Sequence, residues 1–108
     1  MNKGMSPDGT YNYVDERVKN FPQFWSAAFN ETDIIHFFNL DWDITDLVVD
    51  LGFMPSKGQA RRNGYEGDIA TGFEEYIFGK KMNIKKVYTY KPNEKVLRIL
   101  TRYRGIYG

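Results

Sequence analysis

The chain contains no cysteine, only one histidine and no long apolar run. The absence of cysteine excludes disulfides, thiolate chemistry and cysteine-based zinc or iron–sulfur sites. No stretch approaches the roughly 18 apolar residues that a membrane-spanning helix needs, and residues 1–4 lack the charged-then-apolar order of a signal peptide. We therefore expect a cytoplasmic protein that is neither secreted nor inserted in a membrane.

Residue patterns of catalytic and metal sites are also scarce. His36 stands in the apolar run 34–38, where no neighbouring nucleophile or carboxylate suggests a triad or a metal set, so we expect a packed histidine. Glu74 and Glu75 are adjacent, and adjacent carboxylates on a strand point to opposite faces, which disfavours a metal ion shared with Asp68. We expect no cofactor, no metal and no enzymatic activity.

Apolar and aromatic residues are, by contrast, plentiful. They make up 42% and 17% of the 108 residues, which is enough to build a substantial hydrophobic core. A chain of this length fits one domain and is too short for two domains with separate cores. We therefore expect a single domain over residues 1–108.

The charges are distributed unevenly along the chain. Residues 1–51 contain three basic and nine acidic residues, a net charge of −6, whereas residues 52–108 contain twelve basic and five acidic residues, a net charge of +7. Such a division indicates a partner that is itself charged, and a polyanion facing the second half is the obvious candidate. The alternative is that the charges only solvate two surfaces.

The first half of the chain favours short helices. Residues 1–13 are rich in turn-forming glycine, proline and asparagine, so we expect an irregular N-terminal arm. Apolar residues recur at offsets of three and four over 21–29, which predicts a helix, and a second short helix is expected over 32–40. A third is expected over 43–51, where an aspartate or a threonine is placed to cap it.

The second half combines a short basic helix with strands. Ser56 and Gln59 form the pattern of a capping box at the start of this helix. Aromatic and β-branched residues over 73–78 and 84–90 predict a β-hairpin, and residues 96–103 fit either a strand or a helical turn. The sequence therefore predicts an α+β fold with two or three short N-terminal helices, a short basic helix, a β-hairpin and a C-terminal strand or helical turn.

The segment Leu51–Arg62 carries the most specific pattern in the chain. It reads Leu-Gly-Phe-Met-Pro-Ser-Lys-Gly-Gln-Ala-Arg-Arg. This segment resembles the helix–turn–helix signature of the alpha-L RNA-binding motif, which occurs in a ribosomal small-subunit protein, in tyrosyl-tRNA synthetases and in pseudouridine synthases. The resemblance is partial, covers about residues 44–64 and implies RNA binding. The residues that it places on the RNA backbone are Ser56, Lys57, Arg61 and Arg62.

Physical chemistry independently favours phosphate contacts at this helix. A capped helix N-terminus offers free N–H groups and the positive end of the helix dipole to an anion. Basic residues of the hairpin and of the last element extend the expected positive surface, and they are Lys80, Lys81, Lys85, Lys86, Arg98 and Arg102. The leading hypothesis is a non-enzymatic RNA-binding module.

A second hypothesis is a small protein-interaction or inhibitor protein, for example one that a phage encodes and that acts on a host complex. Its acidic and basic poles would then contact a protein, and this hypothesis predicts an exposed apolar or aromatic patch. The compact size, the aromatic content and the lack of a catalytic set fit this class equally well. The sequence leaves the identity of the partner and the oligomeric state open.

Overall fold

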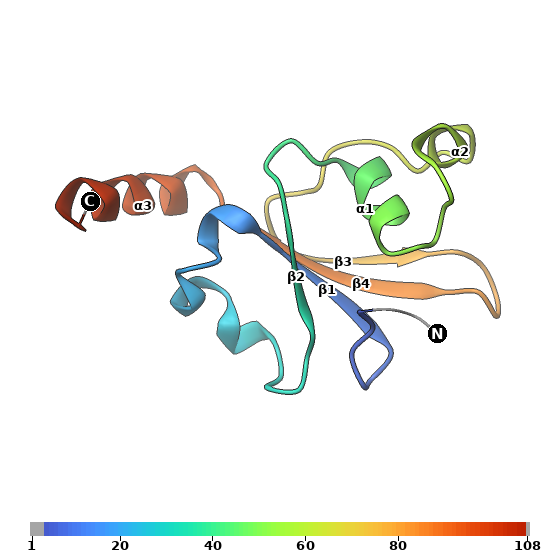
Figure 1. The fold of residues 1–108 in the computed structure, drawn as a ribbon, viewed down its shortest axis with the longest axis horizontal. Helices are drawn as coiled ribbons and strands as arrows, with labels where there is room; N and C mark the ends of the chain where they lie inside the picture. Colours follow the sequence, from blue (N-terminus) through green and yellow to red (C-terminus); the bar gives the residue numbers. More distant parts are fainter. Residues whose placement is uncertain (1–3, 108) are drawn as a thin grey trace.

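A mixed four-stranded sheet lies at the centre of the computed structural model, which describes residues 4–107 and the side chains of residues 4–102 (Figure 1). The strands are β1 (Thr10–Asp15), β2 (Ile35–Phe38), β3 (Gly72–Phe78) and β4 (Lys85–Lys91). Their order across the sheet is β2-β1-β4-β3. β1 runs parallel to both of its neighbours, whereas β3 and β4 pair antiparallel as a hairpin.

Helical segments cover both faces of this sheet. One face carries α1 (Ile44–Asp50) and α2 (Lys57–Arg62), and the other carries short 3-10 turns and the first part of α3 (Glu94–Tyr107) (Figure 1). The 3-10 turns are Glu16–Val18, Pro22–Phe24 and Ser26–Ala28. The predicted α+β fold class is therefore confirmed.

The buried side chains form one cluster on each face. The first core lies between the sheet and α1, with Tyr13, Leu47 and Val87 among its members. The second core lies between the sheet, the 3-10 turns and α3, and its buried members are Val14, Val18, Tyr90 and Leu100. Both cores rest on the same sheet, as in one small domain.

The prediction of an irregular arm over residues 1–13 is wrong for residues 10–13, which belong to β1. Every residue of β1 is buried, because the strand is hydrogen-bonded on both sides and covered on both faces. The turn-forming residues do precede it, since the Gly9 amide donates to the Ser6 carbonyl oxygen in a tight turn. Residues 1–3 of the predicted arm lie outside the described residues.

Two of the predicted N-terminal helices are also wrong. Residues 21–29 form only the last two 3-10 turns, and residues 32–40 contain β2 in place of a helix. Phe37 packs against the second core and Phe38 belongs to the first, so the consecutive apolar residues of β2 serve opposite faces of the sheet. A continuous apolar run of this length has the same appearance in a buried strand and in a buried helix.

The third N-terminal helix, the short basic helix and the hairpin lie where they were predicted. Asp43 caps α1 in a capping box with Asp46, and the Ser56 hydroxyl accepts a hydrogen bond from the Gln59 amide at the start of α2. The reciprocal bond of a capping box is not formed at α2, because the Gln59 side chain accepts from Arg62. The hairpin is confirmed as β3 and β4, and the last element is the helix α3.

Two buried tyrosines of β1 differ in whether the side-chain hydroxyl has a hydrogen-bond partner, and this difference provides a test of the first core. Tyr11 and Tyr13 are each 1% exposed, but the Tyr13 hydroxyl donates to Asp50 Oδ2 at 2.8 Å, whereas the Tyr11 hydroxyl has no partner among the described residues. Burial, and then the hydrogen bond to Asp50, raise the pKa of Tyr13 well above its usual range. Burial also raises the pKa of Tyr11.

We expect Tyr13→Phe to lower the free energy of unfolding by about 1 kcal/mol, because it removes a satisfied hydrogen bond. Tyr11→Phe removes only an unpaired buried hydroxyl and is expected to be neutral or stabilising. Urea unfolding of both variants measures the difference. Equal losses of stability in the two variants would contradict the hydrogen bond between the Tyr13 hydroxyl and Asp50.

Candidate functional site

An aromatic cluster joins the loop before α2 to the end of the hairpin. The Phe53 ring lies 5.2 Å from the ring of Tyr65 and 6.2 Å from that of Phe78, centroid to centroid, and Tyr65 and Phe78 are 5.7 Å apart. Phe53 precedes α2, Tyr65 follows it, and Phe78 ends β3. The cluster thereby holds the short helix α2 beside the hairpin turn at residues 79–84.

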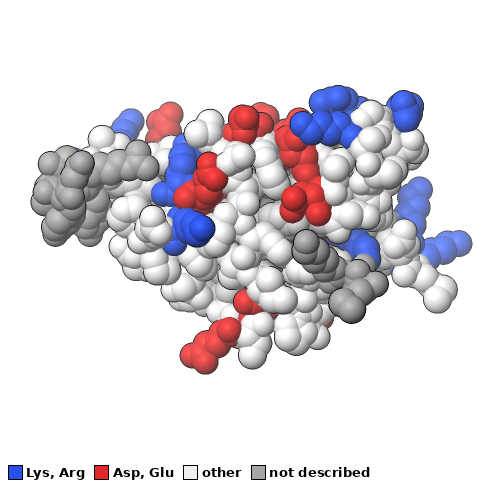
Figure 2. Space-filling model, in the orientation of Figure 1, with Lys and Arg blue, Asp and Glu red and all other residues white. Residues whose placement is uncertain are grey.

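Basic side chains of α2 and of this turn consequently share one end of the molecule. Arg61 and Arg62 lie in the last turn of α2, and Lys80 and Lys81 lie in the hairpin turn. All four are exposed, and no ion pair links them to a carboxylate within the part of the chain that the structure describes. Figure 2 shows blue side chains gathered over this end of the molecule, where Figure 1 places α2 and the turn. We call these four residues the basic end.

Ser56 and Lys57 have structural partners that the sequence pattern does not reveal. The Ser56 hydroxyl is the cap of α2, and the Lys57 Nζ forms an ion pair with Asp46 Oδ1 at 2.8 Å. Burial raises the pKa of Asp46, but hydrogen bonds from Lys57 and the Asp43 amide outweigh it, so the net shift is downward. The same ion pair raises the pKa of Lys57. Ser56 therefore starts α2, and Lys57 fastens α2 to α1.

The other predicted cations lie on β4 and on α3. The Lys85 Nζ lies 5.9 Å from the centre of the Tyr11 ring, and Lys86 lies on β4 beside Thr10 of β1. Arg98 and Arg102 are exposed on α3, at the opposite end of the molecule from α2 (Figure 1). Arg98 also lies 3.7 Å from the Glu94 carboxylate. Lys85 and Lys86 thus lie at the end of the hairpin next to the turn, since they pair with Phe78 and Ile77, whereas Arg98 and Arg102 lie apart from the basic end.

The single histidine has packing partners, and Asp68 takes part in a backbone pairing. His36 Nε2 lies 3.0 Å from the Gly4 carbonyl oxygen, and its ring packs 5.2 Å from that of Tyr13. Asp68 pairs with Asp43 in an isolated β-bridge. Among the described residues, no three His, Asp or Glu side chains are grouped to hold a metal ion.

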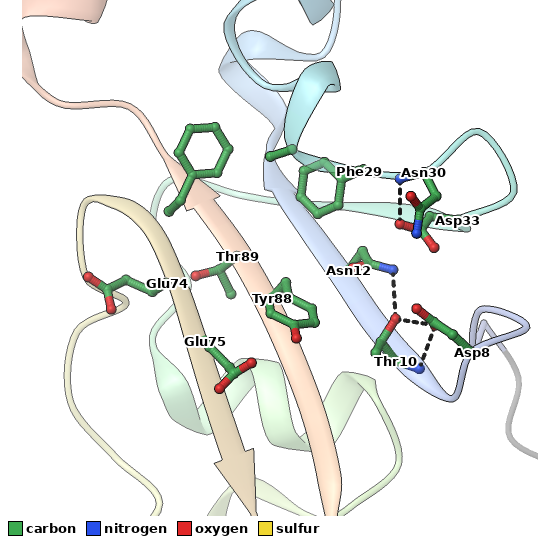
Figure 3. Close-up of a pocket in the computed structure, with 12 residues that line it drawn as sticks. Asp8, Thr10, Asn12, Phe29, Asn30, Asp33, Glu74, Glu75, Tyr88 and Thr89 are labelled. Atoms are coloured by element: carbon green, nitrogen blue, oxygen red, sulfur yellow. Dashed lines mark hydrogen bonds between the residues drawn. The ribbon is translucent and has the colours of Figure 1, made fainter.

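A hollow of about 490 Å³ lies on the second face of the sheet, and the sequence analysis missed it. It lies between strands β1, β3 and β4 and the segment 28–33, and we call it the sheet hollow. Figure 3 shows Tyr88 in its middle, with Glu75 on one side and the hydrogen-bonded series Asn12, Thr10 and Asp8 on the other. These residues come together only through strand register, since Tyr88 pairs with both Asn12 and Glu75.

Exposed apolar side chains continue from this hollow toward the hairpin turn. Phe73 and Ile77 of β3 are 52% and 57% exposed, and Ile84 and Met82 beyond them are also exposed. An exposed apolar patch is the feature that the protein-interaction hypothesis predicts. Within residues 4–107, no helix is long and apolar enough to cross a membrane.

Comparisons with known proteins add no assignment. No protein-family model, no curated protein and no solved structure matches this chain. The resemblance of residues 44–64 to the alpha-L motif therefore stays a prediction.

Proposed function

We propose that this protein is a non-enzymatic RNA-binding module whose basic end contacts the phosphate backbone. The observation that carries the proposal is the gathering of four exposed cations from two segments that are distant in the sequence. They are Arg61, Arg62, Lys80 and Lys81, and none forms an ion pair with a described residue. Lysine and arginine side chains supply most of the affinity for nucleic-acid phosphates. The resemblance of residues 44–64 to an RNA-binding motif favours RNA among the polyanions.

The anchoring of α2 and of the Arg62 side chain supports this function. Arg62 Nη2 donates to Gln59 Oε1 at 2.8 Å, which holds the guanidinium along α2. The Lys57–Asp46 ion pair and the aromatic cluster around Phe53 hold α2 against α1 and the hairpin. Positively charged groups that are already in place lose less conformational entropy when a ligand binds.

The test is a salt series with a fluorescein-labelled RNA stem-loop that carries a single-stranded tail, with duplex DNA for comparison. Arg61→Ala/Arg62→Ala removes two phosphate contacts, so we expect weaker binding and a slope of log affinity against log salt that is flatter by about 1.4 for single-stranded contacts. Anisotropy titrations between low and moderate salt measure both quantities.

The matched control is Arg98→Ala/Arg102→Ala, which removes the same charge from exposed positions on α3. This variant is expected to keep the slope of the wild type. An equal loss in both variants would mean that net charge alone drives binding. No binding of RNA by the wild type at low salt would overturn the proposal and favour a protein partner.

A further inference from the structure

The sheet hollow has the dimensions and the lining of a binding site. Its volume of about 490 Å³ lies in the range of ligand pockets, about 300–1,000 Å³. Aromatic rings of Phe29, Phe73 and Tyr88 line it together with polar groups of β1. Phe73 packs against Tyr90 with ring centroids 4.4 Å apart and ring planes tilted by 35°, a contact that helps to hold this wall in place.

The ionisable groups that line the hollow are all acidic apart from Tyr88. Those whose side chains lie on this face are Asp8, Asp33 and Glu75, whereas the neighbouring Glu74 side chain points away from Tyr88 (Figure 3). None of these carboxylates forms an ion pair with a described residue. Lys86 is a cation on the same face, and it pairs across the strands with Thr10 beside Asp8.

Local hydrogen bonds orient these carboxylates but leave oxygens free. Asp8 Oδ1 accepts from the Thr10 amide and hydroxyl at 3.1 and 2.6 Å, and Asp33 Oδ2 accepts from the Asn30 amide at 2.8 Å. The second oxygen of each carboxylate bonds to no described residue. A hydrogen bond with Glu75 raises the pKa of Tyr88, so the Tyr88 hydroxyl stays protonated at neutral pH.

We propose that the sheet hollow binds an arginine side chain of a basic peptide segment on a partner protein. A guanidinium group donates in a planar fork to carboxylates and also stacks on aromatic rings, and the hollow offers both kinds of partner. The exposed Phe73 and Ile77 lie next to the hollow along β3 and are positioned to contact the rest of the segment. A free small cation would leave this apolar strip uncovered, which is why the occupant is a peptide.

The test uses a fluorescein-labelled pentapeptide with two arginines and the same peptide with citrulline, the neutral isostere of arginine. We expect the arginine peptide to bind at least about ten-fold more tightly, because charge-assisted hydrogen bonds are the stronger ones. Asp33→Asn/Glu75→Gln is expected to weaken its binding by at least about ten-fold while leaving the circular dichroism and unfolding transition unchanged. Chemical shifts of the Thr10, Asn12 and Tyr88 amides should move on titration.

Matched variants and probes separate the alternatives. Asp41→Asn/Glu66→Gln removes two exposed carboxylates outside the hollow, so it changes net charge equally and is expected to leave binding unchanged. An equal loss in this control, or equal binding of citrulline peptide, would overturn the proposal. If agmatine binds as tightly as the arginine peptide, the ligand is a small free cation and the proposal of a peptide is overturned. Sedimentation could show that the wild type is a dimer and that Asp33→Asn/Glu75→Gln dissociates it. That result would mean that a second copy of this chain occupies the hollow, and it would overturn the proposal of a separate partner protein.

Discussion

Replacing Phe38 by alanine is expected to lower the free energy of unfolding by about 3–5 kcal/mol, the usual cost of removing a buried aromatic side chain. Phe38 ends β2, is 1% exposed, and stacks on Trp42 with ring centroids 6.4 Å apart. It belongs to the first core, so its removal leaves a cavity among buried side chains. Urea unfolding measures the loss as a shift of the midpoint at constant slope.

Phe73→Ala is the matched control, because it makes the same chemical change at a side chain that is 52% exposed. Its expected cost is about 1 kcal/mol, chiefly the loss of the ring contact with Tyr90. Similar losses in both variants would contradict the burial of Phe38, and with it the placement of residues 35–38 as a strand against the first core.

β2 shows why the apolar pattern alone misled the sequence analysis. Residues 34–38 are all apolar except His36, and such a run carries neither the alternation of a half-buried strand nor the spacing of a surface helix. The run is explained by two covered faces, with Phe37 serving the second core and Phe38 the first. Which faces are covered depends on elements that follow much later in the chain, so no local pattern contains this information.

Local signals were, in contrast, sufficient for helix starts and for the hairpin. Asp43 and Ser56 cap their helices through contacts that span three residues, and such contacts depend on the immediate sequence. The hairpin needed only two β-prone runs around a glycine-containing turn. The prediction for β1 was wrong because turn-forming residues directly precede a strand that is buried on both faces. The burial shows in its consecutive buried residues Tyr11, Asn12 and Tyr13.

Some residues of the candidate sites can be predicted from the local sequence, and others only from contacts between distant segments. The exposure of Arg61 and Arg62 follows from their place on an amphipathic short helix, and the sequence was enough to single them out. The pairing of Lys57 with Asp46 requires the packing of α2 on α1. The sheet hollow requires the full strand order, because Asp8, Glu75 and Tyr88 come from three different strands or strand ends.

Gly79→Ala is the second change for which we expect a large effect, and it links the fold to the basic end. Gly79 begins the hairpin turn with φ at 99°, and a Cβ there would clash with the carbonyl oxygen of Asn83. The unfavourable backbone conformation costs roughly 1–2 kcal/mol, and forcing the turn apart adds about 1–3 kcal/mol. We therefore expect both a loss of stability and a displacement of Lys80 and Lys81, which follow directly in the turn.

The control for Gly79→Ala is Gly67→Ala, because Gly67 has φ at 108° but an added Cβ would meet no atom within 4 Å. Only the conformational cost of roughly 1–2 kcal/mol is expected there. Thermal or urea unfolding compares the two variants, and RNA titrations show whether only Gly79→Ala weakens binding. If Gly79→Ala lowers the free energy of unfolding no more than Gly67→Ala does, then Gly79 does not lie against the Asn83 carbonyl group as the structure has it. If it is less stable yet binds RNA like the wild type, the turn lysines contribute nothing to the basic end, and the phosphate contacts belong to α2 alone.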